Sequence, residues 1–388
     1  MQTFLVGGAV RDRLLGLSGM DRDWVVVGAT PQEMISQGFL PVGRDFPVFL
    51  HPQTHEEYAL ARTERKSAPG YRGFTIHAAP DVTLEQDLSR RDLTINSIAL
   101  PEALATALGD GAFKSEDLID PFHGRRDIQN KVLRHVTDAF REDPVRILRV
   151  ARFAARFTDF SVAAETRNLM REIVKDGEID ALVAERVWQE LSRGLMEAQP
   201  SRMFDVLVDC GALGVMLPEI DADTALMQVI DMAAHMGTSL AVRFACLVHR
   251  LHTKPLHALC ERWRVPVEVR ELAEVVSREH GHIDRSGDFE ASELMRLLER
   301  CDAIRKPERF DETLLACACI ARAASKDASS HYPPRERLQA ALRAAQDVAT
   351  EPIALAAQQS GAKGPEIGAA IHRARTAAVL HALSSTRP

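Results

Sequence analysis

Two acidic residues near the N-terminus are spaced so that their carboxylates could share a metal ion. Asp21 and Asp23 stand one residue apart, directly before the apolar run WVVV, which predicts a strand. In an extended chain, residues i and i+2 point to the same face. Two carboxylates this close repel each other unless a cation lies between them, and Mg²⁺ prefers such oxygen ligands. We therefore predict that Asp21 and Asp23 are catalytic and bind Mg²⁺.

A Gly-Gly pair precedes these aspartates and predicts a phosphate site. In VGGAVRD, Gly7 and Gly8 end a short strand and open a helix. Glycine lets backbone N–H groups approach a phosphate closely, and a helix N-terminus favours negative charge. Arg11, one turn into the helix, could reach the same phosphates. The pattern predicts that Gly8 and Arg11 contact a nucleoside triphosphate. The alternative is an Asp-rich turn in which the glycines serve only chain geometry.

A third motif, RRDLTIN at residues 90–96, offers groups for the rest of a nucleotide. Arg91 supplies a planar donor fork that suits phosphate. Asp92 could accept a hydrogen bond from a ribose hydroxyl, which would favour ribonucleotides. Taken alone, the same stretch could be a charged helix start.

A fourth motif, EDPVRILR at residues 142–149, could read a base without a template strand. On a helix, Asp143 and Arg146 share a face, and Arg149 lies one step further along. A carboxylate beside a guanidinium complements the amino donor and ring-nitrogen acceptor of cytosine and adenine, whereas guanine and uracil present the reverse order. A mismatch of buried hydrogen bonds costs about 1–3 kcal/mol per group. The alternative is an ordinary ion pair on a helix surface.

In this order, GG…DxD, RRDxTIN and EDxxRxxR resemble the motifs of bacterial class II CCA-adding enzymes, members of the polymerase beta-type nucleotidyltransferase superfamily. The resemblance implies addition of C, C and A to tRNA 3′ ends from CTP and ATP, with two metal ions and release of pyrophosphate. It implies that the carboxylates of Asp21 and Asp23 bind the metal ions. It also implies a nucleotide site made by Gly8, Arg11, Arg91, Asp92, Asp143, Arg146 and Arg149.

Three further stretches extend the resemblance, which is dense over residues 1–220. Residues 62–83 correspond to a flexible element that the family needs for adding the terminal A, which argues against a CC-only enzyme. LIDPFHGRRDIQNKVLRHV, with Asp120, Gly124 and Asp127, resembles a hinge and structural connector. Glu185 and Arg186 resemble a motif that stabilises the neck.

The elements that must position these residues change character along the chain. Over the first 100 residues, strands predicted at FLVGG, WVVVG, FPVFLHP and EEYALAR alternate with helices, one of them opened by Thr30, Pro31 and Glu33. Residues 66–81 predict a mobile loop. After about residue 135 strand signals vanish, and apolar spacings of three and four predict helix after helix.

The predicted fold class is therefore α+β: a nucleotidyltransferase head with a small mixed five-stranded sheet, followed by an all-α neck, body and tail. We predict a catalytic head at residues 1–135, a neck with the base-recognition helix at 136–220, and a helical body and tail at 221–388. An excess of Lys and Arg over residues 322–388 is consistent with contacts to the tRNA elbow through its phosphates.

The sequence of the C-terminal half differs from that of long members of this family, which carry an HD-type metal phosphohydrolase region. In RFACLVHRLHTKP, His249 is followed by Arg250 instead of Asp. Arginine offers no lone pair for a metal. His280 and His282 remain, but two histidines without a carboxylate partner are more often surface residues. We predict a helical scaffold that lacks phosphohydrolase activity.

The composition sets outer limits on function. The chain has 388 residues, 46% hydrophobic and 27% charged, with a net charge of −7, which argues against a generic nucleic-acid coat but not against a local basic groove. The six cysteines form no CxxC pair, and neither a secretion signal nor a membrane span is visible, so we expect a reduced, cytoplasmic protein with no membrane or protein partner.

Two other functions remain open. A bacterial poly(A) polymerase would use the same chemistry, although the chain starts at the catalytic motif without a basic extension. A catalytically silent tRNA-binding protein would have a broken metal site.

Overall fold

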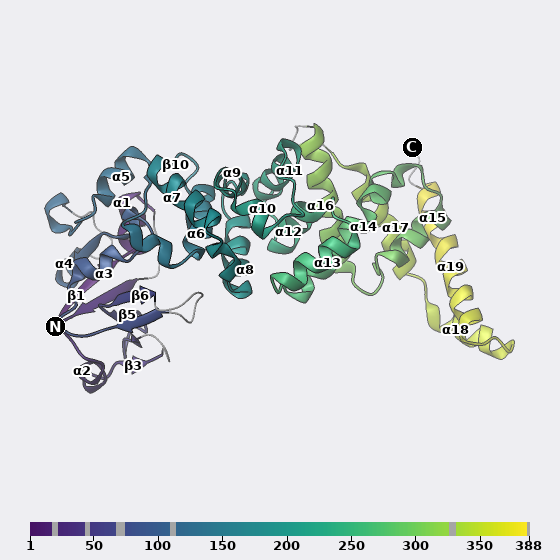
Figure 1. The fold of residues 1–388 in the computed structure, drawn as a ribbon. Coiled ribbons are helices and arrows are strands. Elements are labelled where there is room, and N and C mark those ends of the chain that lie inside the picture. The colour runs from purple at the N-terminus through teal and green to yellow at the C-terminus, as the bar shows by residue number, and fades with distance from the viewer. Residues whose placement is uncertain (18–21, 43–46, 67–73, 109–113, 326–330, 386–388) are drawn as a thin grey trace. The chain divides into compact units, whose positions relative to one another are not determined.

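The chain forms two compact units. The computed structural model describes residues 1–17, 22–42, 47–66, 74–108, 114–325 and 331–385. Unit 1 comprises Met1–Gly194 and Arg202–Met216, and unit 2 comprises Leu195–Ser201 and Leu217–Pro388 (Figure 1). The division into three domains at residues 135 and 220 stays a prediction.

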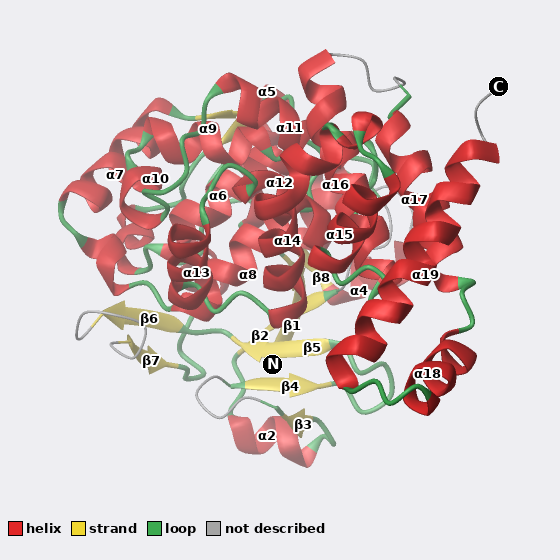
Figure 2. Ribbon diagram, turned by 90° about the vertical axis from the view of Figure 1, so that its right-hand side faces the viewer, coloured by secondary structure: helices red, strands yellow, loops and turns green. Residues whose placement is uncertain are grey.

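A mixed sheet of six strands lies in unit 1, in the order β3-β4-β5-β2-β1-β8 (Figure 2). Strands β2 and β5 are parallel, and the other neighbours are antiparallel. The α+β class is confirmed, but the predicted number of five strands is wrong. The two-residue β3 can pair with β4 yet is too short to show an alternating pattern. The strands are β1 Gln2–Val6, β2 Asp23–Val27, β3 Leu40–Pro41, β4 Val48–Leu50, β5 Glu57–Leu60 and β8 Ala99–Pro101.

The two faces of the sheet follow from strand alternation. Val6 pairs with Asp23, and Asp23 pairs with Glu57, so these three residues share one face. On the opposite face, Trp24 stacks on Tyr58 with ring centroids 5.5 Å apart. The first face therefore carries two carboxylates beside apolar residues, and the second is closed by aromatic packing.

The local sequence explains where the first helices begin. Thr30 caps α2 (Pro31–Ser36), and its hydroxyl accepts from the backbone N–H of Glu33, whose carboxylate accepts from Thr30 in return, as predicted. The other helices that precede the neck are α1 Gly8–Leu14, α3 Leu84–Ser89, α4 Glu102–Leu108 and α5 Gly124–Asn130.

Two strand predictions need correction. The segment 66–81, predicted as a loop, contributes β7 (Phe74–His77), which pairs with β6 (Thr63–Lys66) because ladder hydrogen bonds outweigh the polar composition; residues 67–73 lie outside the described residues. Strand signals were also predicted to vanish after residue 135. The short β10 (Ser161–Val162) nevertheless pairs in parallel with β9 (Val132–Leu133).

The helices that follow, up to Met216, match the predicted periodicity. Apolar spacing of three and four gives each of them a buried stripe. They are α6 Val145–Arg156, α7 Ala164–Lys175, α8 Ala184–Leu195, α9 Ser201–Asp209 and α10 Ala212–Met216. Gly211, with φ of +80°, separates the last two, which the sequence predicted as one helix.

The described part of unit 2 is helical. Its helices are α11 Thr224–His235, α12 Leu240–Val248, α13 Thr253–Arg262, α14 Val267–Asp284, α15 Ala291–Arg300, α16 Pro307–Ser325, α17 Pro333–Gln346, α18 Thr350–Gln359 and α19 Gly364–Ser385. All six cysteines are buried free thiols. Within the described ranges, no helix has the length and apolar character needed to cross a membrane.

Candidate active site

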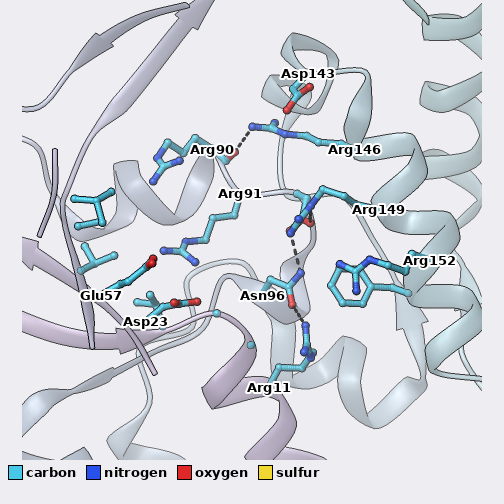
Figure 3. Close-up of a pocket in the computed structure, with 18 of the residues that line it drawn as sticks. Arg11, Asp23, Glu57, Arg90, Arg91, Asn96, Asp143, Arg146, Arg149 and Arg152 are labelled. Carbon is cyan, nitrogen blue, oxygen red and sulfur yellow. Dashed lines mark hydrogen bonds and ion pairs between the residues drawn. The ribbon is translucent and has the colours of Figure 1, made fainter. Parts of the chain in front are cut away.

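A single cavity of about 850 Å³ in unit 1 collects the residues of all four motifs. The sheet face described above forms one side, and α6 forms another (Figure 3). Helix α8 contributes Arg186 and Arg193 to the lining. Arginines dominate the lining and outnumber the carboxylates, so the cavity suits a polyanion. Its charged residues are Arg11, Asp23, Glu57, Arg62, Arg90, Arg91, Asp92, Asp143, Arg146, Arg149, Arg152, Arg156, Arg186 and Arg193.

Two carboxylates on neighbouring strands make the acidic part of the cavity. Asp23 and Glu57 are register partners in the parallel strands β2 and β5, both are exposed, and both line the cavity. Figure 3 shows the two side chains on the same side, with Arg91 close by. The predicted partner Asp21 lies outside the described residues. The oxygen donors of Asp23 and Glu57 fit a hard divalent cation such as Mg²⁺.

The Gly-Gly turn lies under two guanidinium groups. Gly7 has φ of +70°, and a Cβ at this position would lie 3.1 Å from the Nη1 of Arg91. A Cβ on Gly8 would lie 3.5 Å from the Nη2 of Arg11. Each glycine thus leaves room beside an arginine, and the backbone of Gly7 and Gly8 forms a floor beside which the two guanidinium groups lie.

Arg11 is almost completely buried and is held on several sides. Its side chain is 3% exposed, and its Nη1 donates to the amide oxygen of Asn96 at 2.5 Å. The guanidinium lies over the rings of Phe153 and Phe157, 4.9 and 5.2 Å from their centroids. Burial lowers the pKa of Arg11, although its neighbour Asp12 opposes this effect. Arg11 therefore presents a fixed, dehydrated charge.

Arg90 and Arg91 are positioned by one buried carboxylate. Asp87 accepts from Arg90 at 2.7 Å and from Arg91 at 3.2 Å. Burial alone would raise the pKa of Asp87, but the two arginines outweigh it and lower the pKa. Asp87 thus stays ionised and anchors both side chains at the rim of the cavity.

Asp92 is committed to protein partners. Its carboxylate accepts from Arg149 Nε at 2.7 Å and from Asn96 at 2.9 Å, and the residue is 6% exposed. Burial would raise the pKa of Asp92, but Arg149 and Asn96 lower it strongly. The charge of Asp92 in turn raises the pKa of Arg149. The two residues form a permanent ion pair between the RRDLTIN segment and α6.

The base-reading candidates sit at the start of α6, with a partner that the sequence did not suggest. Arg186 of α8 donates to Asp143 through both nitrogens, at 3.0 and 2.7 Å. Arg146 donates to the backbone carbonyls of Ala139 and Arg90, each at 2.6 Å. Asp143 is therefore oriented from another helix, while Arg146 is fixed by the backbone.

Sequence reasoning missed three groups of this site. Glu57 becomes visible only when β5 is placed beside β2, because one glutamate in a strand carries no motif. Arg186 was assigned to neck stability alone. Glu190, which is 4% exposed, binds Arg152 Nε at 2.6 Å and lies 3.6 Å from Arg149. The spacing of Arg186 and Glu190, one helical turn apart, was a usable signal.

The remaining histidines of the C-terminal half form a small buried contact in unit 2. His249 is 5% exposed, its Nδ1 donates to the carbonyl of Cys246 at 2.7 Å, and burial lowers its pKa to about 4. His280 packs edge-on against it with ring centroids 5.4 Å apart, so His280 is half-buried and not the surface residue expected. His282 is exposed, as expected.

Arg250 occupies the position after His249 and pairs with Asp223, the cap of α11, at 2.7 Å. In the part of the chain that the structure describes, no group of three or more His, Cys, Asp or Glu is arranged to hold a metal ion.

The chain is similar to known RNA nucleotidyltransferases in both sequence and fold. Residues 3–134 match the poly A polymerase head domain, and residues 159–224 match the probable RNA and SrmB-binding site of polymerase A. A solved CCA-adding enzyme in complex with CTP has a TM-score of 0.67 at 21% identity, over 97% of this chain and 87% of that one. A Thermotoga maritima CCA-adding enzyme complexed with tRNA has a TM-score of 0.64 at 19% identity, over 100% of this chain and 92% of that one. These likenesses establish a nucleotidyltransferase-type fold.

A much more similar relative comes from Variovorax paradoxus (strain S110). This multifunctional CCA protein is 64% identical, over 98% of this chain and 99% of its own length. The chain belongs to the family of multifunctional CCA proteins, and it is a CCA tRNA nucleotidyltransferase.

Proposed function

We propose that the protein adds and repairs the 3′-terminal CCA of tRNA, using CTP and ATP and releasing pyrophosphate. The observation that carries the proposal is the convergence of four sequence motifs on one arginine-lined cavity beside two carboxylates. A cavity with this charge can take a triphosphate and the 3′ end of an RNA together. The CCA-adding enzymes solved with CTP and with tRNA support the choice of substrates.

Asp21 and Asp23 would hold Mg²⁺, with Glu57 as a third carboxylate from the adjacent strand. Bound there, two such ions would lower the pKa of the tRNA 3′-hydroxyl and stabilise the leaving pyrophosphate. Asp23 and Glu57 are register partners on neighbouring strands and both line the cavity, which supports a metal site shared by the two carboxylates.

The triphosphate would bind at the Gly-Gly floor. Without side chains, Gly7 and Gly8 would let their backbone N–H groups approach the phosphates, and Arg91 and Arg11 lie beside the two glycines. Arg149 carries further positive charge into the same cavity. Because Asp92 is held by Arg149 and Asn96, a ribose hydroxyl would share an oxygen that already accepts a hydrogen bond.

The base would be chosen by Asp143 together with an arginine. Each carboxylate oxygen can accept two hydrogen bonds, so the bidentate contact with Arg186 leaves room for the amino group of cytosine or adenine. Arg146, held by two carbonyls beside Asp143, would donate to the ring nitrogen. Guanine and uracil would leave buried groups unpaired.

In the C-terminal half, we propose that phosphohydrolase activity is absent. Arg250 replaces the aspartate of the HD pair and is engaged by Asp223. The helices of this half would bind the tRNA elbow through its phosphates, as the basic bias of residues 322–388 suggests. We place the enzyme in the cytoplasm, where tRNA is processed.

A product-length assay tests the main proposal. The protein is incubated with tRNA lacking CCA, Mg²⁺, CTP and ATP, and each nucleotide is omitted in turn. We expect three added nucleotides, and only C residues when ATP is omitted. A long A tail would instead indicate a poly(A) polymerase. Binding of tRNA without extension would indicate a silent binding protein.

The metal-binding carboxylates provide a second test. Replacing Asp23 by Ala should abolish incorporation, while tRNA binding, measured by gel shift, remains close to that of the wild type. Glu57→Gln should raise the Mg²⁺ concentration needed for half-maximal rate. Extension by the Asp23 variant at the wild-type rate would show that the metal site is wrongly assigned.

A further inference from the structure

A buried carboxylate outside the cavity lining joins α1, which begins at the Gly-Gly floor, to α6, which carries the proposed base-reading residues. Asp12 follows Arg11 in α1 and is completely buried, with 0% of its surface exposed. Its Oδ1 accepts from Arg11 Nε at 2.7 Å, and its Oδ2 accepts from Arg156 at 3.0 Å. Arg156 is the last residue of α6. The two oxygens of one carboxylate thus bridge two helices that carry different parts of the site.

The surroundings of Arg11 explain why a carboxylate is needed there. A guanidinium that is 3% exposed has lost most of its water. A buried charge is tolerated only when it is paired and hydrogen-bonded. Asn96 supplies a neutral acceptor and Phe153 a ring face, so the full opposing charge in direct contact comes from Asp12.

The direction of the hydrogen bonds matters as well. Nε and Nη1 of Arg11 are used by Asp12 and Asn96, and the remaining Nη2 lies beside Gly8. A guanidinium is planar, so fixing two of its nitrogens fixes the third. Asp12 thereby aims one N–H group of Arg11 at the floor where a phosphate would lie.

We propose that Asp12 is a positioning residue that fixes the guanidinium of Arg11 for the triphosphate and ties α1 to Arg156. The inference rests on the proposed function, in which Arg11 contacts the nucleotide. Every nucleoside triphosphate carries the same phosphates, so Asp12 governs nucleotide affinity without governing the choice of base. Asp143, in contrast, governs the choice of base in the proposed function.

Steady-state kinetics of Asp12→Asn tests this role. The amide keeps the shape of the side chain and removes its charge. We expect KM to rise about tenfold for both CTP and ATP while kcat changes by less than about threefold, because a contact made equally in the ground and transition states affects KM alone. Discrimination against UTP and GTP stays unchanged.

Glu279→Gln is the matched control. Glu279 is 1% exposed and binds Arg278 and Arg300, but it belongs to unit 2. We expect a lower Tm with an unchanged KM. If Asp12→Asn behaved in the same way, losing only Tm or the fraction of active protein, Asp12 would be purely structural and the inference overturned.

Two further measurements keep the result decisive. Should Asp12→Asn fail to fold, Arg156→Gln breaks the ion pair between Asp12 and α6 and also removes one cavity-lining guanidinium. This variant must raise KM for both nucleotides, and an unchanged KM overturns the proposed role of the Asp12–Arg156 pair. CTP binding, titrated without tRNA, is independent of turnover. If the wild type bound CTP but did not extend tRNA, the proposed function would be wrong. The role of Asp12 would still be tested, because Asp12→Asn must bind CTP about tenfold more weakly than the wild type.

Discussion

Arg186 binds both carboxylate oxygens of Asp143 across the gap between α8 and the start of α6. The pair is partly exposed, with 29% and 19% of the two side chains accessible. At the other end of α6, Arg156 is held by Asp12. The helix that carries the proposed base-recognition residues is therefore fixed at both ends by ion pairs to elements distant in sequence.

Loss of the Asp143 carboxylate should relax the choice of base. In Asp143→Ala, the amino group of cytosine or adenine loses its acceptor, so the preference for CTP over UTP should fall about tenfold to a hundredfold. Arg186→Gln should cause a smaller loss, because the carboxylate remains but is less well oriented. The measurement is kcat/KM for each nucleotide on the same tRNA.

Arg171→Gln provides the control for that series. Arg171 forms a similar pair with Asp209 at the surface of unit 1 and does not line the cavity. Its loss should leave the ratio between nucleotides unchanged. An Asp143 variant that kept full selectivity would refute base reading by this carboxylate.

The two glycines of the phosphate floor should respond differently to alanine. Gly7 has φ of +70° and ψ of −131°, a conformation that only glycine adopts readily, and its new Cβ would press on Arg91. Gly7→Ala should lose about 1–3 kcal/mol in the free energy of unfolding. Gly8→Ala should retain the wild-type Tm and raise KM, since its methyl group covers the floor without clashing. Thermal unfolding and kinetics check both; equal changes in Tm would contradict the difference.

Gly124 marks a close contact between α5 and the segment after Asp92. A Cβ here would collide with the carbonyl of Thr94 and lie 2.9 Å from a side-chain carbon of Ile98. Gly124→Ala should therefore destabilise the protein by about 3 kcal/mol. Gly214, in α10, has open space around it, and Gly214→Ala should stabilise by about 0.5–1 kcal/mol. Urea unfolding of the two variants should show shifts of opposite sign.

His249 should make unit 2 sensitive to acid. Its pKa is about 4 in the folded chain, against an ordinary value of 6.5, with Asp223, Arg250 and His280 as its charged or titratable neighbours. The unfolded chain therefore binds a proton that the folded chain refuses, and stability falls as the pH drops from about 6.5 to about 4. In His249→Gln, the loss of unfolding free energy between about pH 6.5 and about pH 4 should be smaller by about 2 kcal/mol. Urea unfolding at several pH values measures this difference. The exposed His252→Gln is the matched control.

Local signals were sufficient for much of the fold. The capping residues Thr30 and Glu33 and the apolar spacing of residues 145–156 act within one or two turns of helix, so the sequence alone predicts them. Strands β3, β7 and β10 were missed because pairing with another strand, rather than their own composition, produces them.

The same distinction applies to the site. Gly8, Arg11, Arg91, Asp92, Asp143, Arg146 and Arg149 were predicted from short motifs, and the structure brings them together around one cavity; their individual roles stay predictions. Which residues these side chains would pair with was not predictable. Arg156 lies 144 residues from Asp12, and Arg186 lies 43 residues from Asp143. No spacing rule links residues that only the folded chain brings together.

Every residue that lines the cavity belongs to unit 1. A change confined to unit 2, such as an arginine after His249, leaves the whole set of cavity-lining side chains intact. The sequence of unit 2 can therefore diverge during evolution while unit 1 keeps the side chains that give the cavity its chemistry.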